Sequence, residues 1–108
     1  MGTFRLTPED PAAEKALFIP LKRVWFEAFL RGVKDTEYRA YGPRWNEATC
    51  RVGRKARLSL GYSNLKYLDR TVAAFEKLPR DKAPEAAREI YPKAPFIAAI
   101  KLATSDGE

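Results

Sequence analysis

The segment from Leu30 to Arg39 constrains the fold more than any other part of the chain. It combines the end of an apolar helical pattern, a glycine, and an alternating run in which Lys34, Glu37 and Arg39 fall within six residues. Three ionised side chains at this spacing are costly to hold beside a packed core unless they pair or meet a ligand. The segment therefore predicts a helix-to-strand junction and a candidate site.

Alternation of apolar and polar residues predicts several short strands around this junction. The expected strands cover residues 16–21, 34–41, 54–60, 65–77 and 95–103. Because the side chains of a strand alternate between its two faces, Glu37 and Arg39 should share one face, with Tyr38 on the other. In the strand over 54–60, the expected inward set is Ala56, Leu58 and Leu60, and the outward set is Lys55, Arg57 and Ser59.

Two helices complete the expected order of elements. Apolar residues at helical spacing predict a helix over 24–31, which Gly32 should end with a left-handed cap. Pro84 suits the start of a second helix, whose apolar stripe is expected to be Ala86, Ala87, Ile90 and Tyr91. The fold class expected is α+β and mainly β, a small barrel with two short helices at its rim. Turns too short for crossover helices argue against a parallel α/β sheet.

The length of 108 residues fits one domain with one modest core. We expect an irregular N-terminal arm over 1–14, because that stretch is polar and punctuated by prolines, followed by a single domain over 15–104. An apolar share of 45% beside 31% charged residues indicates a folded chain rather than a disordered one.

Scarce residue types exclude several classes of site. The chain has no histidine, which excludes Ser-His-Asp catalysis, Cys-His catalysis and histidine-ligated metal sites. Cys50 is the only cysteine, which excludes an internal disulfide and a zinc–thiolate site and favours a reducing setting. No apolar run approaches the roughly 18 residues of a membrane span, and the N-terminal residues lack the apolar core of a secretory signal. Metal binding through carboxylates stays possible, but no carboxylates cluster for it in the sequence. We expect a cytoplasmic protein that uses no metal, no cofactor and no membrane.

Positive charge is concentrated in one part of the chain. The window 22–57 contains ten basic and four acidic residues, which accounts for the whole net charge of +6. Trp25, Tyr38, Tyr41 and Trp45 lie in the same window, and basic residues interleaved with aromatic ones suit phosphate neutralisation and base stacking. A solvated surface with its aromatic residues turned into the core gives the same pattern. For Trp25, on a helix face, we expect the core; for Trp45 both interpretations stay open.

The most specific part of the pattern resembles the ASCH family of the PUA-like superfamily. The residues that carry the resemblance are Ile19-Pro20-Leu21-Lys22, the helix over 25–31, and the run Gly32-Val33-Lys34-Asp35-Thr36-Glu37-Tyr38-Arg39. The family shows a lysine closing its first strand, a helix, and a glycine–x–lysine–x–x–glutamate–x–arginine run. Val52-Gly53 is similar to the family's turn into its next strand, and the general layout extends from Leu17 to Ile100.

The resemblance implies a PUA-like β-barrel whose cleft, between barrel and helices, binds RNA or a nucleotide. By position, the residues expected to line this basic cleft are Lys22, Lys34, Glu37 and Arg39. Other residues of the basic and aromatic window are expected to contact the same single-stranded RNA or nucleotide: Tyr41, Arg44, Trp45, Arg51, Arg54 and Arg57.

An enzyme is the alternative that the resemblance leaves open. The family includes an amidohydrolase that removes acyl groups from acetylated cytidine, and a ribonuclease, and here Lys34 and Glu37 would be the catalytic residues. The amidohydrolase pattern has a threonine where this chain has Glu37, although Thr36 is adjacent, and the acidic residue that often follows the later glycine is Arg54 here.

The residues by themselves allow more than one role for the charged group. Lys34 suits a phosphate contact, a catalytic base, or a solvated cation near a helix C-terminus. Glu37 and Arg39 suit a structural ion pair, or a base contact beside a phosphate contact.

Overall fold

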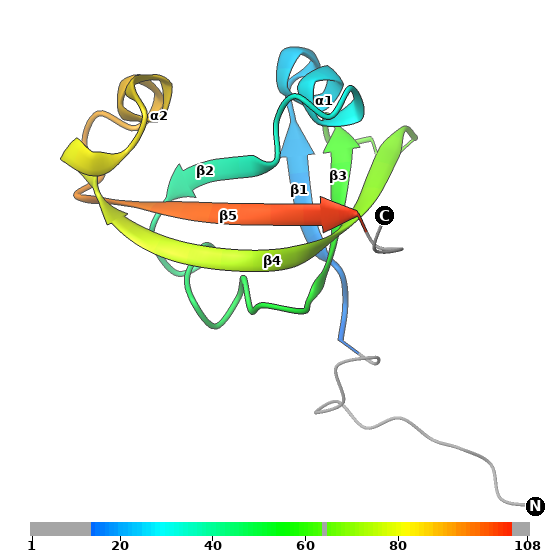
Figure 1. Cartoon of the computed structure of the whole chain (residues 1–108), viewed down its shortest axis with the longest axis horizontal. Coiled ribbons are helices and arrows are strands. Elements are labelled where there is room, and N and C mark those ends of the chain that lie inside the picture. Colours follow the sequence, from blue (N-terminus) through cyan, green and yellow to red (C-terminus); the bar gives the residue numbers. More distant parts are fainter. Residues whose placement is uncertain (1–13, 64, 105–108) are drawn as a thin grey trace, which may run out of the picture.

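The computed structural model describes residues 14–63 and 65–104, which form a curled sheet with two α-helices at its rim (Figure 1). Of the expected N-terminal arm, all but Glu14 lies outside the described residues. The elements, in chain order, are β1 (Leu17–Leu21), α1 (Arg23–Leu30), β2 (Thr36–Ala40), β3 (Lys55–Leu60), β4 (Tyr67–Pro79), a 3-10 turn (Arg80–Lys82), α2 (Glu85–Ile90) and β5 (Phe96–Thr104).

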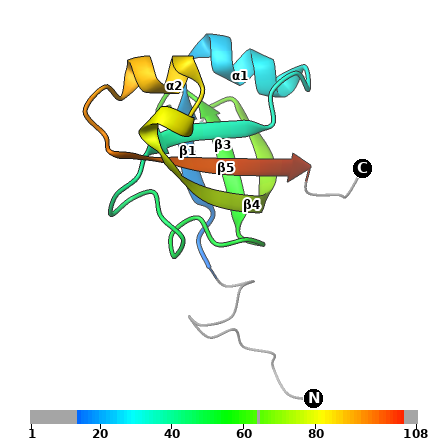
Figure 2. The ribbon, with the colours of Figure 1, turned by 60° about the vertical axis from the view of Figure 1, so that its left-hand side comes forward.

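The five strands lie in the order β1-β3-β4-β5-β2. Strand β1 pairs with β3 in parallel, and all the other pairs are antiparallel. Strands β4 and β5 curve strongly, and the sheet curls into a half-barrel that leaves β1 and β2 as its two edge strands (Figures 1 and 2). Both helices lie on the same side of the sheet (Figure 2). The predicted mainly-β architecture with two short helices at the rim is confirmed.

One main core lies between α1 and the concave side of the sheet. Strand β1 contributes Leu17, Ile19 and Leu21, and α1 contributes Phe26 and Phe29, each at most 7% exposed. A second, smaller cluster packs α2 onto β5. Buried and partly buried residues alternate along β1 with the strand period of two. This confirms the strand that the apolar run at 16–21 predicted. Ser59 departs from expectation: it is fully buried instead of facing solvent.

Helix α1 ends in a complete Schellman motif centred on Gly32. Gly32 has φ 78°, its N–H donates to the Phe29 carbonyl, and the Val33 N–H donates to the Ala28 carbonyl at 3.0 Å. The N–H of Lys34 also donates to Ala28 at 3.2 Å, so the chain turns back beneath the helix. This confirms the predicted glycine cap and brings Lys34 under the face of α1 that carries Trp25 and Phe29. Within the described residues, none of the helices has the length and apolarity to cross a membrane.

Candidate functional site

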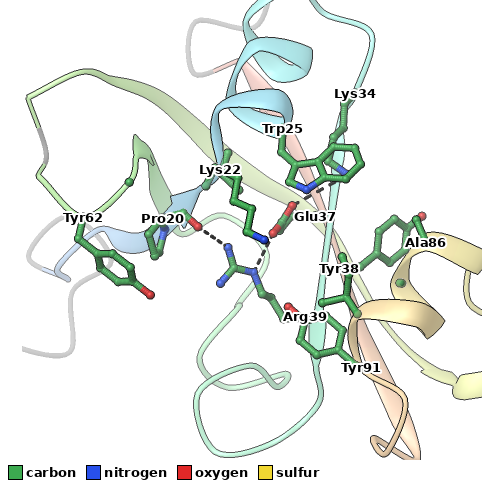
Figure 3. Close-up of a pocket in the computed structure, with 14 residues that line it drawn as sticks. Pro20, Lys22, Trp25, Lys34, Glu37, Tyr38, Arg39, Tyr62, Ala86 and Tyr91 are labelled. Atoms are coloured by element: carbon green, nitrogen blue, oxygen red, sulfur yellow. Dashed lines mark hydrogen bonds and ion pairs between the residues drawn. The ribbon is translucent and has the colours of Figure 1, made fainter.

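A pocket of about 350 Å³ lies where the edge strands β1 and β2 face α2 and the start of α1 (Figure 3). Its walls come from six places in the sequence: the end of β1, the start of α1, the segment between α1 and β2, strand β2, the turn after β3, and α2 with the residue that follows it. The residues that line it are Pro20, Leu21, Lys22, Trp25, Lys34, Glu37, Tyr38, Arg39, Gly61, Tyr62, Ala86, Ala87, Ile90 and Tyr91. The four residues expected to line a cleft, Lys22, Lys34, Glu37 and Arg39, are therefore brought together.

Glu37 lies between two cations in this pocket. Arg39 Nε donates to Glu37 Oε2 at 2.7 Å, and Lys34 Nζ lies 3.9 Å from Glu37 Oε1. Arg39 also donates from Nη2 to the carbonyl oxygen of Pro20 at 2.6 Å (Figure 3). The guanidinium thus divides its donors between a carboxylate and a backbone carbonyl, and does not clasp the carboxylate with two parallel bonds. With side chains only 9–19% exposed, the three groups hold their charges largely out of water.

Lys34 is surrounded by aromatic rings. Its Nζ lies 5.2 Å from the ring centroid of Trp25, 5.5 Å from that of Phe29 and 5.3 Å from that of Tyr38. Burial lowers the pKa of Lys34, while the carboxylates of Glu37 and Asp35 raise it and so offset part of that effect. A lysine in this setting remains able to bind an anion, and it gives up its proton more readily than a solvated lysine.

Arg39 is positioned by an aromatic ring behind it. Its guanidinium carbon lies 4.8 Å from the ring centroid of Trp45, and Trp45 packs in turn against the main core. The loop that carries Trp45 is held by Asn46, whose side chain donates to Gly42 and accepts from the Thr49 N–H. Trp45 does not line the pocket. The core interpretation therefore holds for Trp45, which also supports a pocket cation, while its stacking on a nucleic acid base stays a prediction.

Several aromatic residues of the pocket were not predicted to belong to a site. Trp25 was expected in the core; it packs against the main core as a half-buried residue and also forms a pocket wall. Tyr38 and Tyr91 line the pocket as well, and burial raises the pKa of both hydroxyls. The sequence predicted the apolar stripe on the second helix, and all four of its members line this pocket: Ala86, Ala87, Ile90 and Tyr91. Ala87 belongs to the smaller core cluster as well, and Tyr91 packs against it. Nothing in their spacing distinguishes a pocket wall from a core contact.

The remaining predicted contact residues lie outside the pocket lining. Tyr41 donates from its hydroxyl to Glu47 and has Lys77 Nζ 4.5 Å from its ring centroid. Arg44 is exposed and lies 5.6 Å from the ring centroid of Trp45.

Three further arginines have partners of their own. Arg51 pairs with Glu14, and Arg54 lies 3.5 Å from the same carboxylate while donating to the carbonyl oxygen of Thr49 at 2.6 Å. Arg57 pairs with Asp69 at 3.2 Å on the outer side of the sheet. The structure therefore does not gather these arginines around the pocket.

The chemistry available in the pocket is that of a cationic, aromatic-walled site with one carboxylate. Lys22 is exposed at the mouth and forms no ion pair with any described residue. No group of three or more Asp, Glu or Cys side chains suited to a metal ion occurs among residues 14–63 and 65–104. The pocket can hold an anionic group beside a flat ring, and it offers a carboxylate oxygen to a hydrogen-bond donor.

Comparison with known proteins places the fold. No family model matches the chain, and no curated protein matches it. Among solved structures, the chain is similar to the crystal structure of a mutant of ZmASCH from Zymomonas mobilis, with a TM-score of 0.61 and 13% sequence identity over 80% of this chain and 67% of that chain. At this identity the likeness concerns the fold alone. The chain therefore has an ASCH-like fold, the small mainly-β PUA-like architecture that its sequence resembles.

Proposed function

We propose that the chain is a cytoplasmic protein that binds a nucleotide or single-stranded RNA in the pocket between β1, β2 and α2. One observation carries the proposal: Lys22, Lys34 and Arg39 converge with Glu37 inside a single aromatic-walled pocket. Three cations against one carboxylate favour an anionic ligand. Aromatic walls favour a ligand that is also flat, and a nucleotide combines both properties.

The proposed roles follow from the contacts of each group. The free N–H groups of Arg39 and the ammonium of Lys22 bind phosphate, because Lys22 is exposed at the mouth and Arg39 is held rigidly by Glu37 and Pro20. The rings of Trp25 and Tyr91 contact the base, either from both of its faces or from one side. Glu37 Oε1, which is 3.9 Å from Lys34 and so outside hydrogen-bond range, accepts from a donor on the base edge.

The size of the pocket supports one nucleoside rather than a longer segment. A volume of about 350 Å³ is at the lower end of the range of roughly 300–1,000 Å³ that is usual for small-ligand sites. A single base with its sugar fits such a volume. Any further nucleotides of an RNA would have to lie outside it.

The decisive experiment is a binding titration of mononucleotides and short single-stranded RNAs against a matched pair of variants. Arg39→Ala should weaken binding at least tenfold, while Arg88→Ala should leave it unchanged. Arg88 is a suitable control because it also donates to a backbone carbonyl, that of Ala83, but does not line the pocket. Equal losses in the two variants, or affinity that is indifferent to salt, would refute the proposal.

A second candidate function is hydrolysis of a modified nucleoside or of RNA. The observation that favours it is the burial of Lys34 beside Glu37, because a lysine with a lowered pKa can act as a base at a pH where an ordinary lysine is protonated. In this mechanism Lys34 takes the proton of the attacking group, and Glu37 orients the attacking group.

Turnover separates this enzyme from a binding module. Incubation with acetylated cytidine and with an RNA panel should yield product, and Lys34→Met should abolish that product without changing the circular dichroism spectrum. Absence of any product from the wild-type protein removes the candidate.

A further inference from the structure

We infer that the outer face of β1, β3 and β4 is a second subsite, which binds the nucleotides that flank one held in the pocket. This inference rests on the proposed function and narrows it to single-stranded RNA of several nucleotides. The surface, called the outer strand face below, is defined by five residues: Phe18, Lys55, Arg57, Tyr62 and Tyr67.

The sheet register places this face next to the pocket wall, with the fully buried Ser59 in the middle of the connecting row. Pro20 lines the pocket, pairs with Ser59 across β1 and β3, and Ser59 pairs with Tyr67 across β3 and β4. These three residues form one cross-strand row, so Tyr67 lies two strands, or about 10 Å, from the pocket wall. Tyr62 belongs to both surfaces, because it lines the pocket (Figure 3), and its ring centroid lies 6.5 Å from that of Phe18.

Two tyrosine rings of this face are open to solvent. Tyr62 is 82% exposed and Tyr67 is 42% exposed. The guanidinium of Arg57 lies 3.7 Å from the ring centroid of Tyr67, which holds that ring in place beside the strand. Because Arg57 covers one face of this ring, the other face is the surface on which a base would stack, and any base suits it because every base has a π-face.

The charges of the face suit a nucleic acid backbone. Lys55 and Arg57 follow each other along the outward side of β3, and Lys55 forms no ion pair with any described residue. The partner of Arg57 is Asp69, whose side chain is 58% exposed, and exposed pairs of this kind hold their cation only weakly. A phosphate can therefore compete for Arg57 while a base stacks on Tyr67.

The test compares one nucleotide with a chain of the same nucleotide. Wild-type protein should bind a single-stranded hexanucleotide at least tenfold more tightly than the mononucleotide. Tyr67→Ala should weaken hexanucleotide binding by roughly 5- to 150-fold, which is the usual effect of removing one stacking platform. The same variant should bind the mononucleotide as the wild type does, because Tyr67 does not line the pocket.

Phe96→Ala is the matched control. Phe96 is 38% exposed, starts strand β5, and has the ammonium of Lys77 4.4 Å from its ring centroid, so it resembles Tyr67 in exposure and in its cation contact. It lies outside both the pocket lining and the outer strand face. Its substitution should change neither affinity.

Each outcome has a distinct meaning. If the hexanucleotide binds no more tightly than the mononucleotide, the second subsite is overturned and the pocket proposal still stands. Equal losses of hexanucleotide affinity in Tyr67→Ala and Phe96→Ala have the same meaning. Failure of the wild type to bind either ligand refutes the proposed function, and the second subsite with it. Self-association in sedimentation that Tyr67→Ala abolishes would assign the outer strand face to a second copy of the chain and overturn the RNA subsite.

Discussion

Arg39 donates a hydrogen bond of 2.6 Å to the carbonyl oxygen of Pro20 (Figure 3). The two residues belong to β2 and β1, which are the edge strands at opposite ends of the strand order. The same guanidinium binds Glu37 and lies over the ring of Trp45. One side chain thus ties together the two edges of the half-barrel at the point where the pocket opens between them.

Replacing this guanidinium by an ammonium should weaken the link between β1 and β2. Arg39→Lys keeps the positive charge but cannot reach Glu37 and Pro20 at once, since an ammonium lacks the planar fork. We expect a loss of about 2 kcal/mol in the free energy of unfolding, from the roughly 1.5–3 kcal/mol that a hydrogen bond to a charged group contributes. Urea denaturation measures this loss.

Amide hydrogen exchange shows which strands are destabilised by Arg39→Lys. Arg39→Lys should reduce protection in β1 and β2, whereas Arg88→Lys should not, because the bond from Arg88 to Ala83 joins residues that are near each other in sequence. Unchanged protection of the edge strands in Arg39→Lys would contradict the role assigned to Arg39.

Gly32 should be intolerant of a side chain for reasons of backbone conformation alone. Its φ of 78° lies in the left-handed region, and a Cβ there would meet nothing within 4 Å. Gly32→Ala should therefore cost about 1–2 kcal/mol of stability, the penalty for an L-residue in that region, and shift Tm down by roughly 4–8 °C per kcal/mol in a domain of this size. Gly42→Ala is the control, since a Cβ at Gly42 also meets open space without a positive φ. Similar Tm shifts in the two variants would argue against the cap.

The salt dependence of RNA binding should depend on Lys22. If this exposed lysine contacts a phosphate, Lys22→Ala should make the slope of log K against log salt concentration shallower by roughly 0.7, the contribution of one contact to a single strand. Lys82→Ala removes another exposed lysine, which lies outside the pocket lining, and should leave the slope unchanged. Slopes that are equal in the two variants would remove Lys22 from the binding surface.

The pH dependence of binding should report the loss of the positive charge of Lys34. Because burial lowers the pKa of Lys34, its positive charge is lost on raising the pH sooner than that of a solvated lysine. Affinity for an anionic ligand should fall as the pH rises through this lowered pKa. Lys34→Arg should abolish that fall, since arginine stays charged throughout. A wild-type affinity that is flat up to the pH at which ordinary lysines titrate would contradict the prediction.

Stability should respond to the same titration in the opposite sense. The folded protein bears the cost of burying the Lys34 cation below the lowered folded-state pKa. That cost is relieved as the pH rises from the folded-state pKa toward the higher unfolded-state value, where the unfolded chain binds more protons than the folded one. Wild-type protein should therefore gain stability across this interval relative to Lys34→Arg, as measured by urea denaturation at a series of pH values.

The features that the sequence predicted well depend on short-range geometry. The helix over 23–30 is capped by Gly32 because a left-handed residue and two backbone hydrogen bonds are determined within six positions of the chain. Glu37 and Arg39 share a face because the strand period is two, so their ion pair could be anticipated from their spacing.

The membership of the pocket could not be predicted in this way. Trp25 follows the pattern of a core residue and does pack against the core, but it also forms a pocket wall. Arg51, Arg54 and Arg57 follow the pattern of a basic rim, yet they meet Glu14, Thr49 and Asp69. Local spacing determined the helix end, the strand faces and the Glu37–Arg39 pair. The order of the strands, which sets β1 opposite β2 and turns α2 toward them, decided which cations and rings share a pocket, because that order arises from pairings between residues far apart in the chain.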